Sequence, residues 1–427
     1  MLLGVDIADV SRFENVSNAF LDKCFTEDEI KLFEVKNAAE RMAANYASKE
    51  AFAKAMGTGI SGFGFKDISV LRDEDGKPYF VFSQKIRGIL NSLSVTEVAI
   101  SMSHDGGVAV AVVSAKVDEA FETARQCTEK TDIEDDGIIN LDFVKNSIPK
   151  RKSNTHKGDY GKIFIVAGST GLTGAGILAS KGALFSGGGL ITLGCPENLN
   201  SVFETALAEV MTLPLPQENG VLSDKAADLI VEKANQSSVV AFGSGLTNTK
   251  EVYSVLKKIL RDVNVPVVID ADGINALSRN INILKYAKNE VVLTPHVKEF
   301  SRLCGLTADE ILKNPSEYAS EFATKWGVTV VLKSHETVVA LKDGTVRKNI
   351  LGNPGMATGG TGDVLAGVVA SFVAQNIPNP AESAVYVHSL SADILSKEVG
   401  EYGVTPTKIA EKTAVAINYL QKMKGSN

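Results

Sequence analysis

The sequence has few cysteines, and they are not arranged to bind a metal or to form a disulfide framework. Cys24, Cys127, Cys195 and Cys304 are scattered over 427 residues, without a C-x-x-C pair and without a histidine nearby at zinc-ligand spacing. Disulfide-rich and zinc-binding proteins place their cysteines in close, regular patterns. The sequence therefore indicates neither class, and we expect reduced thiols in a cytoplasmic protein.

Excess basic charge, long apolar runs and an export signal are also missing. The net charge is −7, which argues against a general nucleic-acid-binding surface because phosphate backbones attract basic faces. The longest apolar runs, such as Val364 to Ala374, are far shorter than the roughly 20 residues that cross a bilayer. The opening MLLGVDIADV lacks the basic segment of a signal peptide. We expect no nucleic-acid partner, no membrane span and no export.

Length and composition point to a soluble chain with more than one globular domain. Hydrophobic residues make up 44% and charged residues 22% of the sequence, and a chain this long usually divides between two or three cores. Strand and helix patterns alternate over residues 1–115, and residues 116–136 are acidic and poor in branched aliphatics. Strand-then-helix units repeat over residues 137–427. We predict a small α+β domain, a linker that is a solvated helix or a tether, and an α/β domain whose mostly parallel sheet is flanked by helices.

Three segments of the first domain carry residues suited to chemistry. Asp6 lies in a predicted strand, where aspartate is disfavoured, and its structural alternative is a hydrogen bond to a neighbouring turn. Glu50 and Lys54 lie one turn apart on a helix predicted from Glu40 to Met56, where a surface ion pair is the alternative to a functional role. His104 is predicted in a turn between two apolar runs, where a single histidine is usually structural.

Together these segments resemble the holo-acyl-carrier-protein synthase family over residues 1–114. The resemblance rests on GVDIADVSRF, CFTEDEIKLF, ASKEAFAKAMGTGI, the predicted hairpin DEDGKPYF and AISMSHDGGVAVAVV, in the order and spacing of the family. It implies transfer of 4'-phosphopantetheine from coenzyme A to a serine of acyl carrier protein, a step of fatty acid biosynthesis. It also implies a trimer with active sites between subunits, so we expect a homo-oligomer with acyl carrier protein as its partner.

The same resemblance gives roles to individual residues. Magnesium prefers one or two carboxylates together with substrate phosphates and water, and Asp6 and Glu50 would be those carboxylates at the catalytic centre. His104 would bind phosphate or accept the proton of the attacking hydroxyl. Asp105 departs from the family, which often has an uncharged residue there, and its charge would weaken coenzyme A binding. The groups that would bind the coenzyme A phosphates are Lys49, Lys54 and the backbone from Gly57 to Gly59.

The second domain contains a glycine-rich turn that leads into an apolar helix. The segment NPGMATGGTGDVLAGVVASFVAQ predicts a helix that begins near Asp363. Such a turn presents backbone N–H groups and the positive end of a helix dipole to an anion. Asp363 is either a carboxylate held by that dipole or a base. Because a structural carboxylate would repel phosphate, we interpret Asp363 as the base that takes the proton of a hydroxyl as phosphate is transferred to it.

A second glycine-rich stretch, GSTGLTGAG, fits neither a P-loop nor a dinucleotide fingerprint. From about Leu141 the chain instead resembles the ribokinase-like superfamily and, within it, the NAD(P)H-hydrate dehydratases. The shared motifs are HKGDYGKIFIVAGSTGLTGAG, AFGSGL, VVIDADGINAL, LTPHVKEF, VVLKSHETVVA and NPGMATGGTGD. Members phosphorylate the hydroxyl of hydrated NADH or NADPH (NADHX or NADPHX) with ADP or ATP and then eliminate phosphate. Bacterial members typically use ADP and release AMP.

Carried over by position, the resemblance names the residues of this second site. The hydrated dinucleotide would contact Ala175, Gly245, His296 and Asp363. The adenine nucleotide would contact Lys333, Ser334, His335, Glu336, Thr337 and Gly362. Polar groups near a second ligand or a metal would be Asp270, Asp272 and Asn275, for which an Asx turn is the alternative. The family's usual G-P-G and K-G-A stretches read G-S-G from Gly243 and K-S-H from Lys333 here, and these departures would alter nucleotide affinity or preference.

Each domain has a competing interpretation. The second could be a kinase for a vitamin or a sugar alcohol, because a glycine-rich turn followed by an aspartate serves both reactions. LTPHVKEF and NPGMATGGTGD favour the dehydratase. The first could be a non-catalytic oligomerisation module, an interpretation that Asp6, Lys49 and Glu50 oppose.

Overall fold

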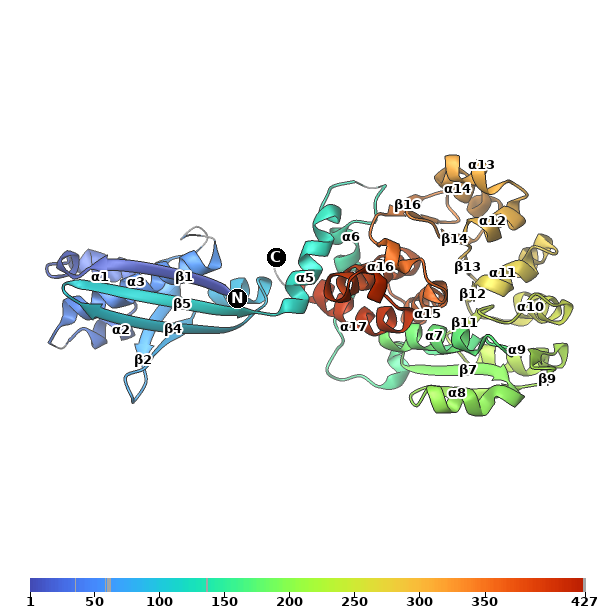
Figure 1. Cartoon of the computed structure of the whole chain (residues 1–427), viewed down its shortest axis with the longest axis horizontal. Coiled ribbons are helices and arrows are strands. Elements are labelled where there is room, and N and C mark those ends of the chain that lie inside the picture. The colour runs from blue at the N-terminus through green and yellow to red at the C-terminus, as the bar shows by residue number, and fades with distance from the viewer. Residues whose placement is uncertain (35, 58, 60–62, 136, 425–427) are drawn as a thin grey trace. The chain divides into compact units, whose positions relative to one another are not determined.

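The computed structural model divides into two compact units (Figure 1). One unit comprises Met1–Glu122 with the chain from Lys422 on, and the other comprises Thr123–Gln421. The first is α+β, and the second is α/β with a mostly parallel sheet, which confirms the predicted fold classes. The residues that the structure describes are 1–34, 36–57, 59, 63–135 and 137–424.

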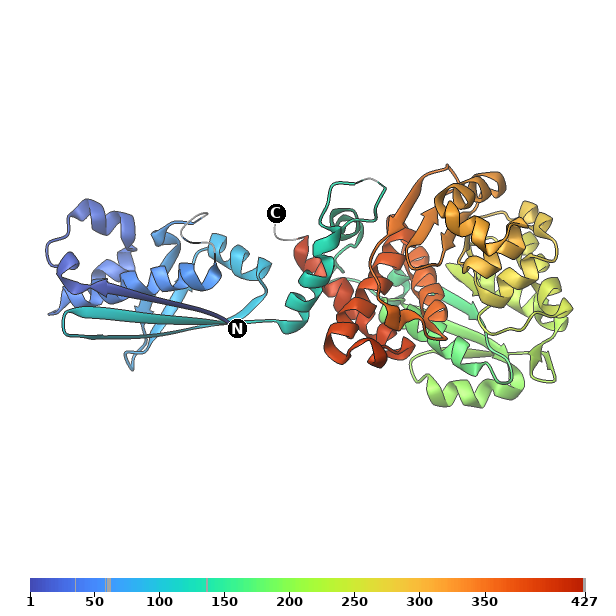
Figure 2. The ribbon, with the colours of Figure 1, turned by 45° about the horizontal axis from the view of Figure 1, so that its top comes forward.

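An antiparallel sheet and one long helix form the core of the first unit. In spatial order, the strands are β1 (Leu2–Asp9), β5 (Val108–Val117) and β4 (Val95–Asp105). Helix α3 (Ala38–Met56) packs on one face of this sheet, as the turned view in Figure 2 shows. A Cβ atom on Gly4 would lie 2.0 Å from the carbonyl oxygen of Ala51, so only glycine allows this close contact. The helix predicted from Glu40 to Met56 is confirmed and begins two residues earlier.

The turn between β4 and β5 corrects one prediction. Gly106 and Gly107 form the turn, with φ values of 57° and 82° that favour glycine. Because these two residues suffice, β4 continues through Asp105, and His104 pairs in the strand with Ala109. The prediction that His104 lies in a turn is therefore wrong. Its backbone is fixed by the sheet.

Short elements complete the first unit. The predicted hairpin is confirmed: the Asp73 carboxylate accepts hydrogen bonds from the N–H groups of Asp75 (3.1 Å) and Lys77 (2.8 Å) at its turn. The aromatic side chain of Phe52, from α3, packs against the rings of Phe80 and Phe82 in the hairpin. The bounds are α1 (Asn18–Cys24), α2 (Glu27–Leu32), β2 (Ile68–Arg72), β3 (Pro78–Phe82) and α4 (Gln84–Ser92).

The predicted linker contains helix α5 (Glu119–Thr128). The helix and the turn after it are not fully solvated, because Ala124, Cys127 and Thr131 are buried. In the second unit, the Thr131 hydroxyl lies 2.8 Å from the hydroxyl of Tyr386. The shortage of branched aliphatics hid this buried face. The boundaries at 115/116 and 136/137 stay predictions.

A nine-stranded sheet organises the second unit. Seven of its strands run parallel, namely β6, β7, β8, β11, β12, β13 and β14. The other two, β15 and β16, are antiparallel to their neighbours. The chain leaves β6 towards β7 and β8 on one side and later builds β11 to β14 on the other. The direction in which successive strands are added to the sheet therefore reverses between β6 and β11. In open α/β sheets, ligands bind at such a reversal of strand order. In spatial order the strands are β16 (Val346–Asn349), β15 (Thr337–Ala340), β14 (Thr329–Leu332), β13 (Val291–Leu293), β12 (Val267–Ile269), β11 (Val239–Phe242), β6 (Lys162–Val166), β7 (Leu190–Pro196) and β8 (Met211–Leu215).

Helices cover both faces of this sheet (Figure 1). Figure 1 shows α7, α15, α16 and α17 on one face, and α9, α10, α11 and α12 on the other. Buried strand residues such as Val240 and Val268 explain why these strands are apolar throughout. No helix in the described part of the chain is long and apolar enough to cross a membrane. The helices are α6 (Leu141–Ser147), α7 (Thr173–Phe185), α8 (Asn200–Ala206), α9 (Ala227–Asn235), α10 (Lys250–Asp262), α11 (Ala271–Leu277), α12 (Val297–Cys304), α13 (Ala308–Lys313), α14 (Pro315–Trp326), α15 (Thr361–Ala374), α16 (Pro380–Val399) and α17 (Pro406–Met423).

Candidate active sites

In the first unit, the structure brings Asp6, Glu50 and Lys54 together. The Lys54 ammonium lies 2.8 Å from the Asp6 carboxylate, which joins β1 to α3. Hydrogen bonding to Asp6 and the charges of Asp6 and Glu50 raise the pKa of Lys54. Glu50, one helical turn before Lys54, accepts a 3.4 Å hydrogen bond from the hydroxyl of Tyr46. The structural alternative, a Glu50–Lys54 surface pair, is thus replaced by a pair across two elements, with both carboxylates near one cation.

His104 lies apart from this group. It is half-exposed, and its Nδ1 atom is 3.7 Å from a carboxylate oxygen of Glu40, in the first turn of α3. Asp6 is in register with Met102 across β5, and His104 is two residues further along β4. At ordinary strand spacing, this separates the Asp6 and His104 Cα atoms by about 12 Å. One copy of the unit does not bring His104 to the two carboxylates.

Gly57 and Gly59 follow α3. Gly57 ends the helix in the left-handed conformation, with a φ of 71°, and its N–H group donates to the carbonyl oxygen of Lys54. Gly59 also has a positive φ of 56°. Apart from each glycine and its chain neighbours, no atom of the described residues lies within 4 Å of a Cβ position built on either glycine. Thr58, inside the predicted phosphate-binding stretch, lies outside the described residues.

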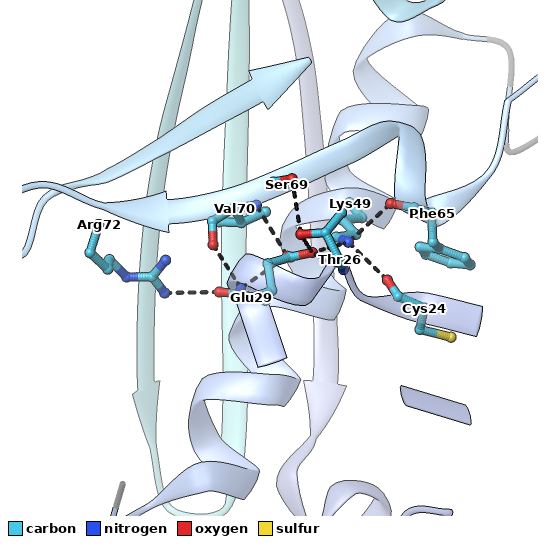
Figure 3. Close-up of polar contacts among 9 residues, drawn as sticks. Cys24, Thr26, Glu29, Lys49, Phe65, Ser69, Val70 and Arg72 are labelled. Atoms are coloured by element: carbon cyan, nitrogen blue, oxygen red, sulfur yellow. Dashed lines mark hydrogen bonds and ion pairs between the residues drawn. The ribbon is translucent and has the colours of Figure 1, made fainter. Parts of the chain in front are cut away.

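Lys49 requires a correction. Its side chain is 1% exposed, and its three ammonium hydrogens have three acceptors: Glu29 at 2.6 Å and the carbonyl oxygens of Cys24 at 2.8 Å and Phe65 at 3.0 Å (Figure 3). The predicted binding of coenzyme A by Lys49 is not compatible with this position, because no donor is left and no surface is open. Burial lowers the pKa of Lys49, and the Glu29 carboxylate opposes the shift. The sequence pattern missed this because Glu29 is 20 residues away.

Glu29 is the centre of a buried polar network. Besides Lys49, it accepts hydrogen bonds from the backbone N–H groups of Thr26 and Val70 and from the Asn45 amide. Figure 3 shows Thr26, Lys49 of α3 and Val70 of β2 around Glu29. The network therefore holds together the elements around the helix that carries Glu50 and Lys54.

Replacing Glu29 with alanine is expected to lower the free energy of unfolding of the first unit by about 3–5 kcal/mol, because it leaves the Lys49 ammonium buried without a counter-ion. Urea unfolding followed by far-ultraviolet circular dichroism measures the loss. Trp326 is the single tryptophan and lies in the second unit, so its fluorescence transition should not move.

Two controls test that interpretation. Asp28→Ala removes an exposed carboxylate paired with Lys31 and should hardly change the midpoint. The double variant Glu29→Leu with Lys49→Met removes both buried charges and should recover much of the lost stability. Equal loss in the single and double variants would contradict a charge-pair explanation.

In the second unit, the predicted residues gather where the chain reverses between β6 and β11. The Ser169 hydroxyl, after β6, donates a 2.8 Å hydrogen bond to the carbonyl oxygen of Gly245, after β11. A Cβ on Gly245 would lie 2.8 Å from Cβ of Ala175, at the start of α7. The φ of 65° at Gly245 also favours glycine. Two of the residues predicted to contact the dinucleotide are therefore neighbours here.

Asp270, directly after β12, is the polar centre of the site at the carboxyl ends of the parallel strands. Its carboxylate lies 2.8 Å from the Lys333 ammonium, after β14, and accepts hydrogen bonds from the hydroxyls of Thr294 (2.7 Å) and Ser244 (3.2 Å). The Asp270 side chain makes no Asx turn at the start of α11. Sequence reasoning missed the roles of Thr294 and Ser244. Their signal is the recurrence of a polar residue within two positions of the end of consecutive apolar strands.

Asp272 and Asn275 have structural partners. An Asp272 oxygen accepts a 2.8 Å hydrogen bond from the N–H group of Thr247, and its other oxygen accepts a 3.2 Å bond from Asn275. Asn275 in turn accepts a bond from Arg302. These contacts tie α11 to the loop after β11 and to α12.

Asp363 and Lys333 meet at the start of α15. A Cβ on Gly362 would lie 3.1 Å from the Lys333 ammonium, which places that cation against the first turn of the helix. Burial and the negative charge of Asp270 raise the pKa of Asp363 from 3.8 to about 6. Burial acts to lower the pKa of Lys333, but the Asp270 and Glu299 carboxylates outweigh it and raise that pKa. The Asp363 carboxylate and the Lys333 ammonium are therefore close enough for their charges to interact.

His296 and the remaining nucleotide residues border this group. His296 caps α12: its Nδ1 atom accepts from the N–H groups of Lys298 and Glu299 at 3.1 and 3.2 Å. Burial and the nearby Lys333 lower the pKa of His296, which favours its neutral form. Its backbone pairs with that of Lys333. The connection from Lys333 to β15 contains Ser334, His335 and Glu336, and Thr337 is the first residue of β15.

The described part of the chain contains no cluster of three or more His, Cys, Asp or Glu side chains that could hold a metal ion. Asp6 and Glu50 supply only two carboxylates. This donor set fits magnesium, which takes one or two carboxylates and completes its shell with substrate phosphates and water.

The parallel sheet, its reversal point and the aspartate at the start of α15 define a ribokinase-like domain. The sequence model of the NAD(P)H-hydrate dehydratase family matches residues 163–414, and that of the 4'-phosphopantetheinyl transferase superfamily matches residues 2–113. The chain belongs to the NAD(P)H-hydrate dehydratase family and carries a phosphopantetheinyl transferase superfamily domain before it. Both are enzyme families, and the two resemblances seen in the sequence are confirmed.

Individual relatives agree with this assignment. The bifunctional NAD(P)H-hydrate repair enzyme Nnr of Moorella thermoacetica is 37% identical over 267 residues, which cover 62% of this chain and 50% of that protein. The ADP-dependent (S)-NAD(P)H-hydrate dehydratase of Staphylococcus aureus is 32% identical over 290 residues, 67% of this chain and 99% of that protein. The chain thus spans about half the length of the Nnr relative and nearly all of the dehydratase.

A solved structure supports the fold of the same region. The ADP/ATP-dependent NAD(P)H-hydrate dehydratase from Bacillus subtilis, co-crystallized with ATP and Mg²⁺, superposes with a TM-score of 0.57 and 27% identity. The match covers 67% of this chain and 100% of the Bacillus chain.

Proposed function

We propose that the second unit converts (S)-NADHX and (S)-NADPHX to NADH and NADPH at the expense of ADP, releasing AMP and phosphate. The observation that carries the proposal is the position of Asp363 beside the Lys333 ammonium and the first turn of α15. Its pKa of about 6 leaves it ionised at neutral pH, as a base requires. The ADP dependence named for the Staphylococcus relative supports the choice of nucleotide. ATP is the alternative.

In this reaction, Asp363 takes the proton of the ring hydroxyl while the hydroxyl oxygen attacks the terminal phosphorus of ADP and AMP leaves. Lys333 and the N–H groups at the start of α15 stabilise the negative charge on the transferred group. Phosphate then leaves with the electrons of the carbon–oxygen bond, and the neighbouring ring carbon loses a proton, which restores the double bond. Ala175, Gly245 and His296 would contact the dinucleotide. Ser334, His335, Glu336, Thr337 and Gly362 would contact the adenine nucleotide.

The test is incubation of the full chain with ADP, magnesium and hydrated NADH, followed by absorbance at the NADH band. Recovery of NADH with stoichiometric AMP supports the dehydratase. No recovery with either ADP or ATP, together with phosphorylation of a hydroxymethylpyrimidine or hydroxyethylthiazole, would support the vitamin-kinase alternative instead.

Lys333→Met is expected to lower kcat/KM for this reaction by about a hundredfold, because one preorganised cation is lost from the developing charge. Steady-state kinetics measure the effect. Lys298→Met, at an exposed lysine of the neighbouring helix, is the control and should leave kcat/KM unchanged. Lys333→Arg keeps the charge beside Asp270 and should retain more activity than Lys333→Met. Equal rates for the two would argue against an electrostatic role.

For the first unit, we propose transfer of 4'-phosphopantetheine from coenzyme A to a serine of acyl carrier protein. Asp6 and Glu50 would hold magnesium, which neutralises the pyrophosphate of coenzyme A when bound. Lys54 and the turn at Gly57 would bind its phosphates. Conversion of apo to holo carrier protein, followed as a mass increase, tests the proposal. Absence of conversion in a chain that still recovers NADH would favour the oligomerisation module.

We further propose that the first unit self-associates through the outer face of its sheet. Leu3, Val5 and Ile7 of β1 are 63%, 44% and 63% exposed, and Val112 of β5 lies opposite Val5 on this face. A contiguous apolar face of this kind usually marks an interface. Association would also bring His104 of one copy towards the carboxylates of another, as the family's trimer implies. Light scattering on Val5→Glu, which should dissociate the oligomer, tests this.

A further inference from the structure

The second unit has a cavity that the proposed reaction does not use. The cavity measures about 720 Å³, within the range of small-molecule sites. It opens between the chain before β6, the end of α7, the end of α15 and α17. The residues that line it include Lys150, Arg151, Lys152, Tyr160, Phe185 and Phe372.

This cavity lies at the opposite end of α15 from Asp363. Both places are marked on α15, because Asp363 is in its first turn and Gln375, which follows its last residue, lines the cavity. The 12-residue separation corresponds to about 18 Å along the helix axis. A ligand of ordinary size in the cavity would not reach the proposed base.

The cavity joins an apolar floor to a cationic rim. Phe185, Phe372 and Ile417 supply apolar surface, and the rim carries the three consecutive cations of residues 150–152. The acidic residue in the lining is Asp159, whose carboxylate already accepts a 2.9 Å hydrogen bond from the backbone of His156. The lining is therefore net positive.

Two of the three cations have no partner among the described residues. The ammonium groups of Lys150 and Lys152 are exposed, and neither makes a hydrogen bond or an ion pair with a described residue. The Arg151 guanidinium lies over the ring of Tyr160, with 3.8 Å between its central carbon and the ring centroid, and donates to the carbonyl oxygen of Gly187. These two contacts hold the guanidinium at the wall of the cavity. The planar, charged guanidinium group of an arginine stacks on aromatic rings and attracts anions.

We propose that this cavity is a second binding site, for a small organic phosphate with a planar aromatic body. The aromatic body would stack on the Arg151–Tyr160 wall and cover the apolar floor at Phe185 and Phe372. The phosphate would pair with Lys150 and Lys152. The site is separate from the proposed dehydratase reaction and does not depend on it.

The test is calorimetric titration of the full chain with 1-naphthyl phosphate, decanoate and inorganic phosphate. We expect 1-naphthyl phosphate to bind with one site per chain, at least about tenfold more tightly than either other probe. The double variant Lys150→Glu with Lys152→Glu should weaken this binding at least about tenfold, because charge attraction becomes repulsion. Ala414→Trp, at an exposed position of α17 that lines the cavity, should abolish it by filling the space.

Lys313→Glu with Lys342→Glu makes the same charge change at exposed lysines outside the cavity and should bind like the parent. Melting temperatures show whether each variant is folded. Three outcomes would overturn the proposal: no binding of 1-naphthyl phosphate, binding that survives Ala414→Trp, or equal affinity for decanoate. Equal weakening in the control pair would also overturn it, since the net charge of the chain would then explain the effect.

Discussion

Replacement of Asp363 by asparagine is expected to lower kcat for ADP-dependent recovery of NADH by about 10³-fold. The amide keeps the size of the side chain and its place at the start of α15, but it cannot take a proton from the substrate hydroxyl. KM should change little, since the loss concerns the transition state. Continuous absorbance at the NADH band gives both constants.

The pH profile supplies a second readout of the same group. Burial and Asp270 raise the pKa of Asp363 to about 6, so kcat/KM should fall as the pH drops below about 6, where the base becomes protonated. The residual activity of the asparagine variant should lack this inflection. A parent profile that is flat from pH 5 to pH 8 would contradict the assignment of Asp363 as base.

Stability distinguishes lost chemistry from lost folding. Because the folded-state pKa of Asp363 lies above its ordinary value of 3.8, its contribution to stability is present at low pH and lost as the pH rises through about 6. The ionised group is therefore unfavourable in the folded chain at pH 8, and the asparagine variant should melt no lower than the parent there. Asp309→Asn, at an exposed first-turn aspartate of α13, is the matched control and should leave kcat unchanged.

The second large effect is expected at Asp6. Asp6→Ala should lower the conversion of apo to holo acyl carrier protein by about a hundredfold or more, because it removes one of two carboxylates available to magnesium. Part of the loss should return as the magnesium concentration is raised, a response that damaged folding would not give. The mass of the carrier protein reports the conversion.

The same variant contains its own control. The dehydratase reaction uses residues of the other unit, so recovery of NADH by Asp6→Ala should equal that of the parent. Asp28→Asn changes an exposed carboxylate of the same unit and should leave both activities unchanged. Full conversion of carrier protein by Asp6→Ala would remove the metal assignment and leave the first unit without its proposed chemistry.

Much of this organisation could be predicted from the sequence because its signals are local. The periodicity of apolar residues predicted α3 and its end at Gly57, and the glycine-rich run before an apolar segment predicted the start of α15 near Asp363. Short apolar runs followed by polar residues predicted a parallel sheet with its site at one edge. Each of these depends on neighbours within a few residues, which the sequence displays directly.

The errors and omissions concern partners that are distant in the chain. Lys49 was predicted to bind coenzyme A, but it is buried against Glu29, and nothing local to either residue indicates that pairing. His104 was predicted to lie in a turn. Gly106 and Gly107 close the hairpin by themselves, so the strand continues through His104. The positions of Ser244, Thr294 and Lys333 around Asp270 depend on the order of parallel strands, which brings residues from four separate loops together.

The sequence by itself thus determined the two families, the elements and most of the chemical groups, since motif and periodicity are properties of contiguous residues. Only the tertiary structure decided which charges are paired, how deeply they are buried, and hence which remain available to a ligand. The reason is physical: the pKa of Asp363, the burial of Lys49 and the exposure of Lys150 and Lys152 depend on solvent exclusion and through-space contacts. Neither can be read along the chain.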